Sequence, residues 1–378
     1  MAIKISGTTV IDDSKVLYTN VINPISAGGV GIGTTVSING VPYPSDGTFS
    51  GFRNKIINGH MEFDNRDLGP YTATSAGGYT LDRWVQSEDT DGTATVQQST
   101  TAPAGFGQSL LWTTGTADTS LAATQYAQIV QYIEGKNIID LSWGTASAKT
   151  VTLSFWVRSS LTGTFGGGVK NKANATRSYT FSYVINSANT WEYKTITIPG
   201  DTTGSWSTDT STGMVVSFCL ASGSTYQTAA NTWTAGNYIT PSGCVNVMGT
   251  AGATFYLTGV QLELGSVATP FEWRNRAQEL YLCRRYFGVY AAYIVGSTGF
   301  LTPGPTYNYA VIGSVINYGQ IMRTTPGITT TPSSTTYNVG NVTTSPTARE
   351  CFYYATGTAL NWGYINQIYY IDAELTGA

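Results

Sequence analysis

The stretch TVTLSFWVRSS, residues 150–160, decides the fold class of this protein. Val151, Leu153, Phe155 and Val157 alternate with Thr, Ser, Trp and Arg residues, so one face of an extended segment is apolar. A helix would instead place its apolar residues three and four positions apart. The pattern therefore predicts a β-strand with one face in a hydrophobic core.

Working outward from this strand, the same character recurs in WEYKTITIPG (191–200) and MVVSFCLASG (214–223), with loops rich in Gly, Ser and Thr between the segments. Short strands at this spacing, with no long helical pattern between them, indicate an antiparallel sandwich or jelly roll. We therefore expect an all-β protein with a jelly-roll domain over residues 51–275.

The composition supports a β-rich protein. Only 11% of the 378 residues are charged, against about 25% in ordinary soluble proteins, whereas Gly (43) and Tyr (25) are abundant. The net charge is -3 and no basic stripe occurs, so nucleic acid is not an expected partner. The sequence contains no run of 18 apolar residues, so we expect no membrane span. Residues 1–18 lack the apolar core of a secretory signal.

The stretch GVQLELGSVATPFEWRNRAQELYLCRRYF, residues 259–287, closes the predicted sandwich. It begins as a strand in which Gly259 is a candidate bulge, and Pro270 ends the strand. Leu280, Cys283 and Phe287 then form a helical stripe, which predicts a linking helix over 276–287. We interpret the charges concentrated here as the solvated side of that half-exposed helix.

Two further regions flank these elements. Residues 1–50 have β character but few apolar residues, so we expect an extended attachment segment that is ordered by neighbouring chains or by a docking partner; a flexible tail is the alternative. Residues 288–378 return to strand patterns rich in aromatic side chains, which predicts a second, smaller β domain.

Catalytic signatures are weak, and we expect no enzyme and no cofactor. His60 is the only histidine and lies in a loop-like stretch without a nucleophile motif. Carboxylates could hydrolyse a sugar only as a suitably spaced pair, and we expect Glu263 to be a solvated strand residue and Glu272 to pair locally with Arg274 or Arg276. The residues considered for acid–base or metal chemistry are Glu62, Asp64 and Asp67 for hydrolysis, and Asp12, Asp13, Asp89 and Asp91 for a Ca²⁺ site that stays undecided.

The four cysteines are far apart in the sequence and are expected to be thiols.

Aromatic residues in Ser-, Thr- and Gly-rich loops are the remaining candidates for ligand binding. Flat rings flanked by hydroxyl and amide groups suit sugars, which present apolar C–H faces and many hydroxyls. The equally weighted alternative is that these rings fill a thin sandwich or the seams of a trimer. The candidate glycan-binding residues are Trp206, Tyr226, Trp233, Tyr307, Tyr309 and Tyr337.

Four blocks in chain order carry a family resemblance: NKIINGHMEFDNR (54–66), YTLDRW (79–84), SFWVRSS (154–160) and the stretch 259–287. Together with the opening MAIKISGTTVIDD, they resemble the recurrent blocks of bacteriophage tail fibre and related virion appendage proteins. The resemblance implies a virion structural protein, commonly trimeric, with an N-terminal attachment segment, a jelly roll like a carbohydrate-binding module and a distal β domain facing the host. It also implies that Tyr79, Trp84 and Phe271 pack the jelly roll, and that Asp82, Arg83 and Glu272 pair locally.

The resulting hypothesis is a non-enzymatic tail fibre subunit, made in the host bacterial cytoplasm and located on the virion. Residues 1–50 would bind tail or baseplate proteins, and the expected partners are other copies of the chain in a homotrimer and host surface polysaccharide. One alternative is a purely structural baseplate, head-fibre or adaptor protein without receptor binding. A polysaccharide-degrading spike is less favoured, because neither β-helix repeats nor a convincing acid pair is present.

Overall fold

A computed structural model describes residues 3–5, 8–11, 36–38, 41–43, 52–66, 69–172, 177–296, 311–330, 335–337, 339–357 and 363–375. The chain divides into two compact units, Met1–Gly47 and Thr48–Ala378. In the first unit, β1 (Ile3–Ile5) pairs with β2 (Thr8–Ile11), and β3 (Val36–Ile38) pairs with β4 (Val41–Tyr43), both antiparallel. Whether this unit attaches to another protein stays a prediction.

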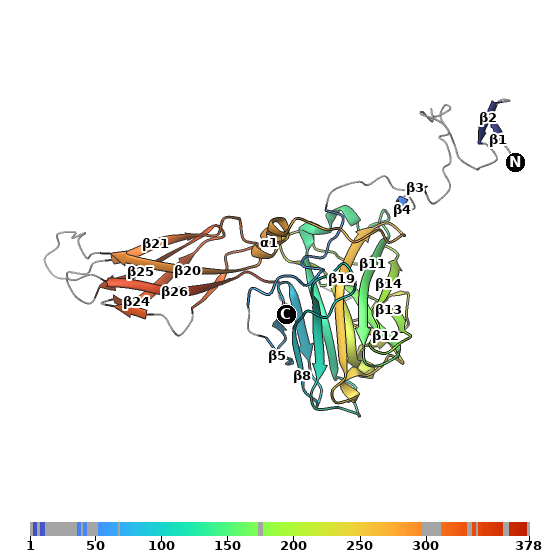
Figure 1. The fold of residues 1–378 in the computed structure, drawn as a ribbon, viewed down its shortest axis with the longest axis horizontal. Coiled ribbons are helices and arrows are strands. Elements are labelled where there is room, and N and C mark those ends of the chain that lie inside the picture. The colour runs from blue at the N-terminus through green and yellow to red at the C-terminus, as the bar shows by residue number, and fades with distance from the viewer. Residues whose placement is uncertain are drawn as a thin grey trace. The chain divides into compact units, whose positions relative to one another are not determined.

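The second unit contains a two-sheet β-sandwich, which confirms the predicted fold class (Figure 1). All strand pairs within the two sheets are antiparallel. The seven-stranded sheet has the order β17 (Trp233–Ala235), β13 (Arg177–Ile185), β12 (Gly163–Asn171), β15 (Thr212–Ser222), β10 (Tyr126–Glu134), β7 (Trp84–Glu88) and β6 (Gly78–Tyr79).

The second sheet of the sandwich is six-stranded. Its order is β14 (Glu192–Ile198), β11 (Val151–Ser159), β19 (Thr254–Leu264), β9 (Ser109–Thr114), β8 (Ala94–Ser99) and β5 (Tyr71–Thr72). The chain passes repeatedly from one sheet to the other, for example from β10 to β11 to β12, so most neighbours within a sheet are distant in sequence. This crossing between sheets is the jelly-roll arrangement.

The core lies between the two sheets and is built from the inward faces of their strands. Val151, Leu153, Phe155 and Val157 of β11 are fully buried, as the alternation predicts. Phe155 meets Phe218 of the opposite sheet edge-to-face at a centroid distance of 4.9 Å. Such aromatic pairs add about 0.5–1.5 kcal/mol beyond the area that they bury.

Gly259 forms the predicted bulge in β19. The register between β11 and β19 shifts between the pairs Ser154–Gln261 and Trp156–Thr258, so one extra residue is inserted on β19. Gly259 has a φ of +60°, and a Cβ there would lie 2.8 Å from Cζ of Phe106. Both the left-handed backbone and the lack of space therefore favour glycine at this position.

Smaller elements connect the sandwich strands. β16 and β18 form a short parallel pair. The bounds are β16 (Gln227–Thr228), β18 (Thr240–Pro241) and 3₁₀ helices at Gly135–Asn137, Ile139–Leu141, Ser224–Tyr226 and Val247–Gly249.

A short helix follows the sandwich. α1 spans Arg276–Arg284, where Asn275 caps the helix by accepting a hydrogen bond from the N–H of Ala277 at 2.9 Å. Cys283 is fully buried, as the predicted stripe requires. The helix is shorter than the predicted 276–287, because the chain is extended again in β20 from Phe287 onward.

Two further sheets follow α1 and form the second β region that the sequence predicts. Their apolar contacts include Ile316, Cys351 and Tyr369, which are buried in one cluster. The first sheet contains β20 (Phe287–Gly296), β26 (Gly363–Asp372), β22 (Gly327–Thr330) and β23 (Thr335–Tyr337), and the second contains β21 (Val311–Asn317), β25 (Glu350–Gly357) and β24 (Val339–Pro346).

The interpretation of the charges in 259–287 as a solvated helix face is wrong for several of them. Glu279 is buried, and Nη1 of Arg274 lies 3.1 Å from Oε2 of Glu279. Glu279 also accepts a hydrogen bond from the N–H of Asn58, and Arg274 donates to the carbonyl of Ile56 at 3.2 Å. These charges hold residues 52–58, which precede the sandwich in the chain, against residues 274–279, which follow it. The spacing of residues within one segment does not reveal such a tertiary contact.

Candidate functional site

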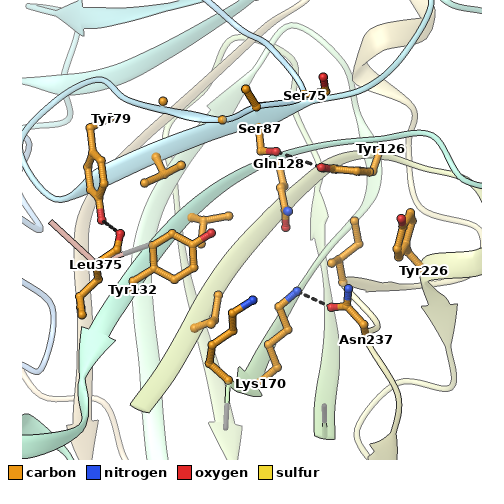
Figure 2. Close-up of a pocket in the computed structure, with 18 of the residues that line it drawn as sticks. Ser75, Tyr79, Ser87, Tyr126, Gln128, Tyr132, Lys170, Tyr226, Asn237 and Leu375 are labelled. Atoms are coloured by element: carbon orange, nitrogen blue, oxygen red, sulfur yellow. Dashed lines mark hydrogen bonds between the residues drawn. The ribbon is translucent and has the colours of Figure 1, made fainter. Parts of the chain in front are cut away.

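A cavity of about 600 Å³ lies on the outer face of the seven-stranded sheet. Because Ala127 and Ile129 of β10 point into the core, Gln128, Val130 and Tyr132 point outward into this cavity (Figure 2). The cavity is lined by Ser75, Ala76, Gly77, Gly78, Tyr79, Val85, Ser87, Tyr126, Gln128, Val130, Tyr132, Lys170, Asn171, Lys172, Val215, Tyr226, Asn237, Ile239 and Leu375.

The floor of the cavity is apolar. Val85, Val130 and Val215 come from three adjacent strands and are buried together, with Tyr79 and Tyr132 packed against them. The hydroxyl of Tyr79 donates a hydrogen bond to the carbonyl of Leu375 at 2.5 Å, so a residue near the C-terminus closes one side. Burial raises the pKa values of Tyr79 and Tyr132, which keeps both phenols neutral.

Two tyrosine rings lie at another part of the wall. Tyr126 and Tyr226 meet edge-to-face with centroids 5.3 Å apart. The hydroxyl of Tyr126 lies 3.1 Å from Oγ of Ser87, which fixes the ring on β10 (Figure 2). The wall thus combines aromatic surface with hydroxyl groups.

The amide of Gln128 projects into the same space with one unsatisfied group. Its Oε1 atom is buried and has no hydrogen-bond partner among the residues that the structure describes. A buried acceptor without a partner costs about 1–3 kcal/mol, so a donor group from a ligand would be stabilised here.

The charge of the cavity is positive. Lys170 and Lys172 are the charged side chains that line it, and no carboxylate lines it within the described ranges. Lys170 Nζ donates to Oδ1 of Asn237 at 2.7 Å (Figure 2). Burial, together with repulsion by Lys172, lowers the pKa of Lys170 to about 8.

The predicted glycan-binding residues are not all brought together. Tyr226 lines the cavity, whereas Trp206 and Trp233 pack around Trp143 elsewhere in the sandwich, with Trp206 only 8% exposed. Nε1 of Trp206 donates to Asp201 at 3.2 Å, and Trp206 lines a separate cavity of about 400 Å³.

The other three candidates lie in the C-terminal region. Tyr337 ends strand β23, where it pairs with Tyr364, and Tyr307 and Tyr309 lie outside the described residues. Their contribution to binding stays a prediction.

Sequence reasoning missed Tyr126, Gln128 and Lys170. The alternation in YAQIVQYIE (126–134) marks an outward face with Tyr, Gln and Tyr, which was the available signal. It does not reveal that Lys170 of β12 and Asn237 of a loop lie across the same cavity.

The candidate carboxylates are held in structural roles. Glu263 is buried, not solvated: it accepts hydrogen bonds from Gln261 at 2.8 Å and from the backbone and hydroxyl of Thr269 at 2.8 and 2.6 Å. Glu272 does pair with Arg274, at 3.3 Å, but it mainly accepts from the backbone N–H groups of residues 52–54.

His60 and Glu62 are also engaged by neighbouring side chains. Nε2 of His60 lies 2.8 Å from Glu62, and Glu62 also binds Arg276 at 2.6 Å. Asp67, Asp12 and Asp13 lie outside the described residues, and the described part of the chain contains no cluster of three metal-ligating side chains. Cys219, Cys244, Cys283 and Cys351 are thiols outside any disulfide, as expected. None of the helices in the described ranges has the length and apolarity needed to cross a membrane.

One packing detail implied by the family resemblance differs in the structure. Trp84 is buried in the sandwich core and Tyr79 packs on the outer face of the seven-stranded sheet, whereas Phe271 packs against Phe106 and is not part of the core cluster. Asp82 and Arg83 do not pair with each other: Asp82 lies 3.6 Å from Arg66, and Arg83 binds the C-terminal Glu374.

No protein family model matches this sequence, and no curated protein matches it. Among solved structures, the chain is similar to the enzymatically active domain of tailspike protein 4 of bacteriophage CBA120, with 15% identity, a TM-score of 0.32 and coverage of 57% of this chain and 22% of that one. It is also similar to the family 11 carbohydrate-binding module of Clostridium thermocellum (14% identity, TM-score 0.27, 50% and 91% covered) and to the xylan-binding CBM22-1 domain of Paenibacillus barcinonensis (10%, 0.27, 52% and 95%). TM-scores this low do not establish a common fold, so the fold assignment rests on the strand order itself.

Proposed function

We propose that this chain is a non-enzymatic bacteriophage tail fibre subunit, and that it binds host-surface glycan in the cavity on the outer face of the seven-stranded sheet. The tail fibre part of the proposal is supported by the order of the four sequence blocks. The glycan part is supported by the geometry of the cavity.

The observation that carries the proposal is the combination of groups around Gln128. Tyr126 and Tyr226 offer aromatic surface, Val130 gives an apolar floor, and Gln128 Oε1 is an acceptor without a partner among the described residues. Sugar rings carry C–H faces that pack on aromatic and apolar side chains, and hydroxyl groups that donate hydrogen bonds. A sugar is therefore complementary to both kinds of group.

Attachment would gain strength from several copies of the chain. Residues 1–50 would hold the subunit on the virion, and a homotrimer would present three cavities. Linked sites can strengthen binding by roughly 10²–10⁴ when the geometry allows simultaneous contact. A modest affinity in each cavity is then sufficient for attachment.

Glycan cleavage is not part of the proposal. Three of the candidate carboxylates are engaged in other contacts: Glu62 binds Arg276, Glu263 accepts from Thr269, and Glu272 accepts from the backbone of residues 52–54. None of the three lines the cavity.

The test is binding of the full-length chain to a glycan array and to host cells, compared with the variant Tyr226→Ala. Loss of an aromatic wall of the cavity should weaken binding about tenfold or more, since aromatic residues at the centre of an interface commonly carry more than 1 kcal/mol. Tyr281→Ala is the matched control, because Tyr281 is a 56% exposed tyrosine on α1 outside the cavity.

Three outcomes are distinguishable. Binding that Tyr226→Ala reduces and Tyr281→Ala preserves supports the proposal. Binding that neither variant changes would place the glycan site elsewhere. A folded chain that binds no glycan and no host cell would favour a purely structural or adaptor protein.

Removal of residues 288–378 is not an equivalent test. Leu375 lines the cavity and Glu374 forms the buried ion pair with Arg83 of the sandwich. Truncation would therefore disturb the sandwich itself, and point substitutions are preferable.

A further inference from the structure

We infer that the cavity binds an anionic glycan, whose carboxylate or phosphate group lies against Lys170. The inference rests on the proposed function of the same cavity and adds the chemical class of its ligand. It starts from the charges that line the cavity.

The positive charge in the cavity contrasts with the negative charge of the whole chain. The whole chain has a net charge of -3, yet the charged groups lining this cavity are two lysines. Two other cations do have a carboxylate partner: Arg177 lies 2.7 Å from Asp201, and Arg285 lies 2.7 Å from Glu134. Lys170 instead has a neutral amide, Asn237, as its hydrogen-bond partner.

Lys170 has hydrogen-bonding capacity left for a ligand. An ammonium group carries three N–H donors, and Asn237 accepts from one of them in the described structure. Burial of a charge that has no counter-ion among the described residues is costly, and burial together with Lys172 lowers the pKa of Lys170 to about 8. An anion from the ligand would remove that cost and would form a charge-assisted hydrogen bond.

The other titratable groups that line the cavity do not compete for this role. Besides Lys172, they are four phenols, of Tyr79, Tyr126, Tyr132 and Tyr226. Burial raises the pKa values of Tyr79 and Tyr132, so these two stay neutral where Lys170 titrates. The ligand is therefore the source of negative charge that fits the site.

Neutral groups lie next to the lysine and fit the remainder of a sugar. Gln128 Oε1 can accept from a hydroxyl, and the rings of Tyr126 and Tyr226 can pack on the ring carbons. Figure 2 shows Lys170, Asn237, Gln128 and Tyr226 around the same space. Recognition of an acidic sugar needs this pairing of one cation with aromatic and amide groups.

The experiment applies the full-length chain to an array that carries neutral oligosaccharides, uronic- and sialic-acid oligosaccharides, and glycerol phosphate oligomers. We expect binding to acidic probes, weakened by added salt and by a rise in pH from 7 to 9 as Lys170 loses its proton. Lys170→Gln should weaken this binding about tenfold to a hundredfold, the range for losing a hydrogen bond to a charged group. Lys170→Arg should retain part of it, and Lys149→Gln, at an exposed lysine outside the cavity, should leave it unchanged.

The carboxylate and phosphate probes identify which anion is bound. Binding only to neutral probes that Tyr226→Ala weakens would overturn this inference and keep the proposed function. Acidic binding that Lys170→Gln leaves intact, in a variant with an unchanged thermal unfolding curve, would also overturn it. Failure to bind any probe would contradict both.

Discussion

Arg83 and Glu374 form an ion pair although 291 positions separate them in the sequence. Their side chains are 1% and 3% exposed, and the Arg83 guanidinium lies over the ring of Tyr286, 3.6 Å from its centroid. Burial by itself would lower the pKa of Arg83, but the charge of Glu374, together with Tyr79, Tyr286 and Cys283, outweighs burial and raises it. Arg66 lies 3.3 Å from the same carboxylate and 3.6 Å from Asp82, so two buried cations share Glu374 and Asp82 supplies a second negative charge. Glu374, near the C-terminus, thus supplies the negative charge that pairs with the buried Arg83 of the sandwich.

The first prediction concerns this ion pair. Glu374→Gln should lower the free energy of unfolding by about 3–5 kcal/mol, because the substitution removes the carboxylate that pairs with the buried Arg83, while Arg66 keeps Asp82 at 3.6 Å. Asp372→Asn is the control, since Asp372 is 51% exposed and 4.0 Å from Arg66, and it should cost less than about 1 kcal/mol. Urea unfolding measures both, and equal small losses would contradict the buried role of Glu374.

The second prediction concerns the bulge in β19. Gly259→Ala should destabilise the protein by about 1–3 kcal/mol, because it combines a left-handed backbone with a Cβ 2.8 Å from Phe106. Gly252→Ala separates the two effects: Gly252 has a φ of +76° but nothing within 4 Å of the added Cβ. It should cost about 1 kcal/mol, and an equal loss in both variants would exclude crowding as a cause.

The third prediction concerns the attachment of residues 52–54. Glu272→Ala should speed amide hydrogen exchange at Phe52, Arg53 and Asn54, whose N–H groups donate to Glu272 at 2.7, 2.9 and 2.9 Å. Glu192→Ala is the reciprocal control, because Glu192 accepts from the N–H groups of residues 186 and 187 in another loop. Each variant should affect its own loop alone, and no change at residues 52–54 in Glu272→Ala would refute this role.

The same carboxylate has a predictable pH dependence. Burial alone would raise the pKa of Glu272, but the hydrogen bonds from residues 52–54 and the charge of Arg274 outweigh burial and lower it below its ordinary 4.5. A lowered folded pKa means that this stabilisation is complete above pH 4.5 and is lost as the pH falls through the folded value. In the wild type, the protection of the amides of residues 52–54 against hydrogen exchange should therefore decrease as the pH falls. In Glu272→Ala, which lacks this carboxylate, protection should show no such decrease.

The fourth prediction concerns Lys170 without any ligand. The ordinary lysine pKa is 10.5 and that of Lys170 is about 8, so between these values the unfolded chain binds more protons than the folded one. Stability of the wild type should therefore rise with pH between about 8 and 10.5 relative to Lys170→Met. At pH 7 the variant should be more stable by about 1–3 kcal/mol, because it lacks the partly buried charge.

Thermal unfolding from pH 7 to pH 10.5 measures this difference. Lys149→Met, which changes an exposed lysine outside the cavity, should show no comparable pH-dependent gain. A constant difference between wild type and Lys170→Met over the whole range would show that the Lys170 charge is not costly in the folded protein.

The sequence by itself determined the class of structure. Alternation in residues 150–160 placed Val151 and Phe155 in the core, and Gly259 marked a bulge, because both signals depend on geometry within a few residues. The polar face of the same strand was less predictable: Thr152 and Ser154 are buried as well, although alternation places them away from the core. Periodicity identifies two faces, but it does not say what covers the second one.

Only the tertiary structure decided where the charges and the site lie. Glu263 and Glu279 read as solvated residues from their local pattern, yet both are buried. Glu263 lies opposite Thr152 of β11, and Glu279 accepts a hydrogen bond from the N–H of Asn58, so each is covered by a segment distant in sequence. The cavity brings Gln128, Lys170 and Leu375 together because β10 and β12 both pair with β15, and because Tyr79 donates a hydrogen bond to Leu375. Local propensity acts over a few residues, whereas burial and charge compensation depend on contacts between residues far apart along the chain.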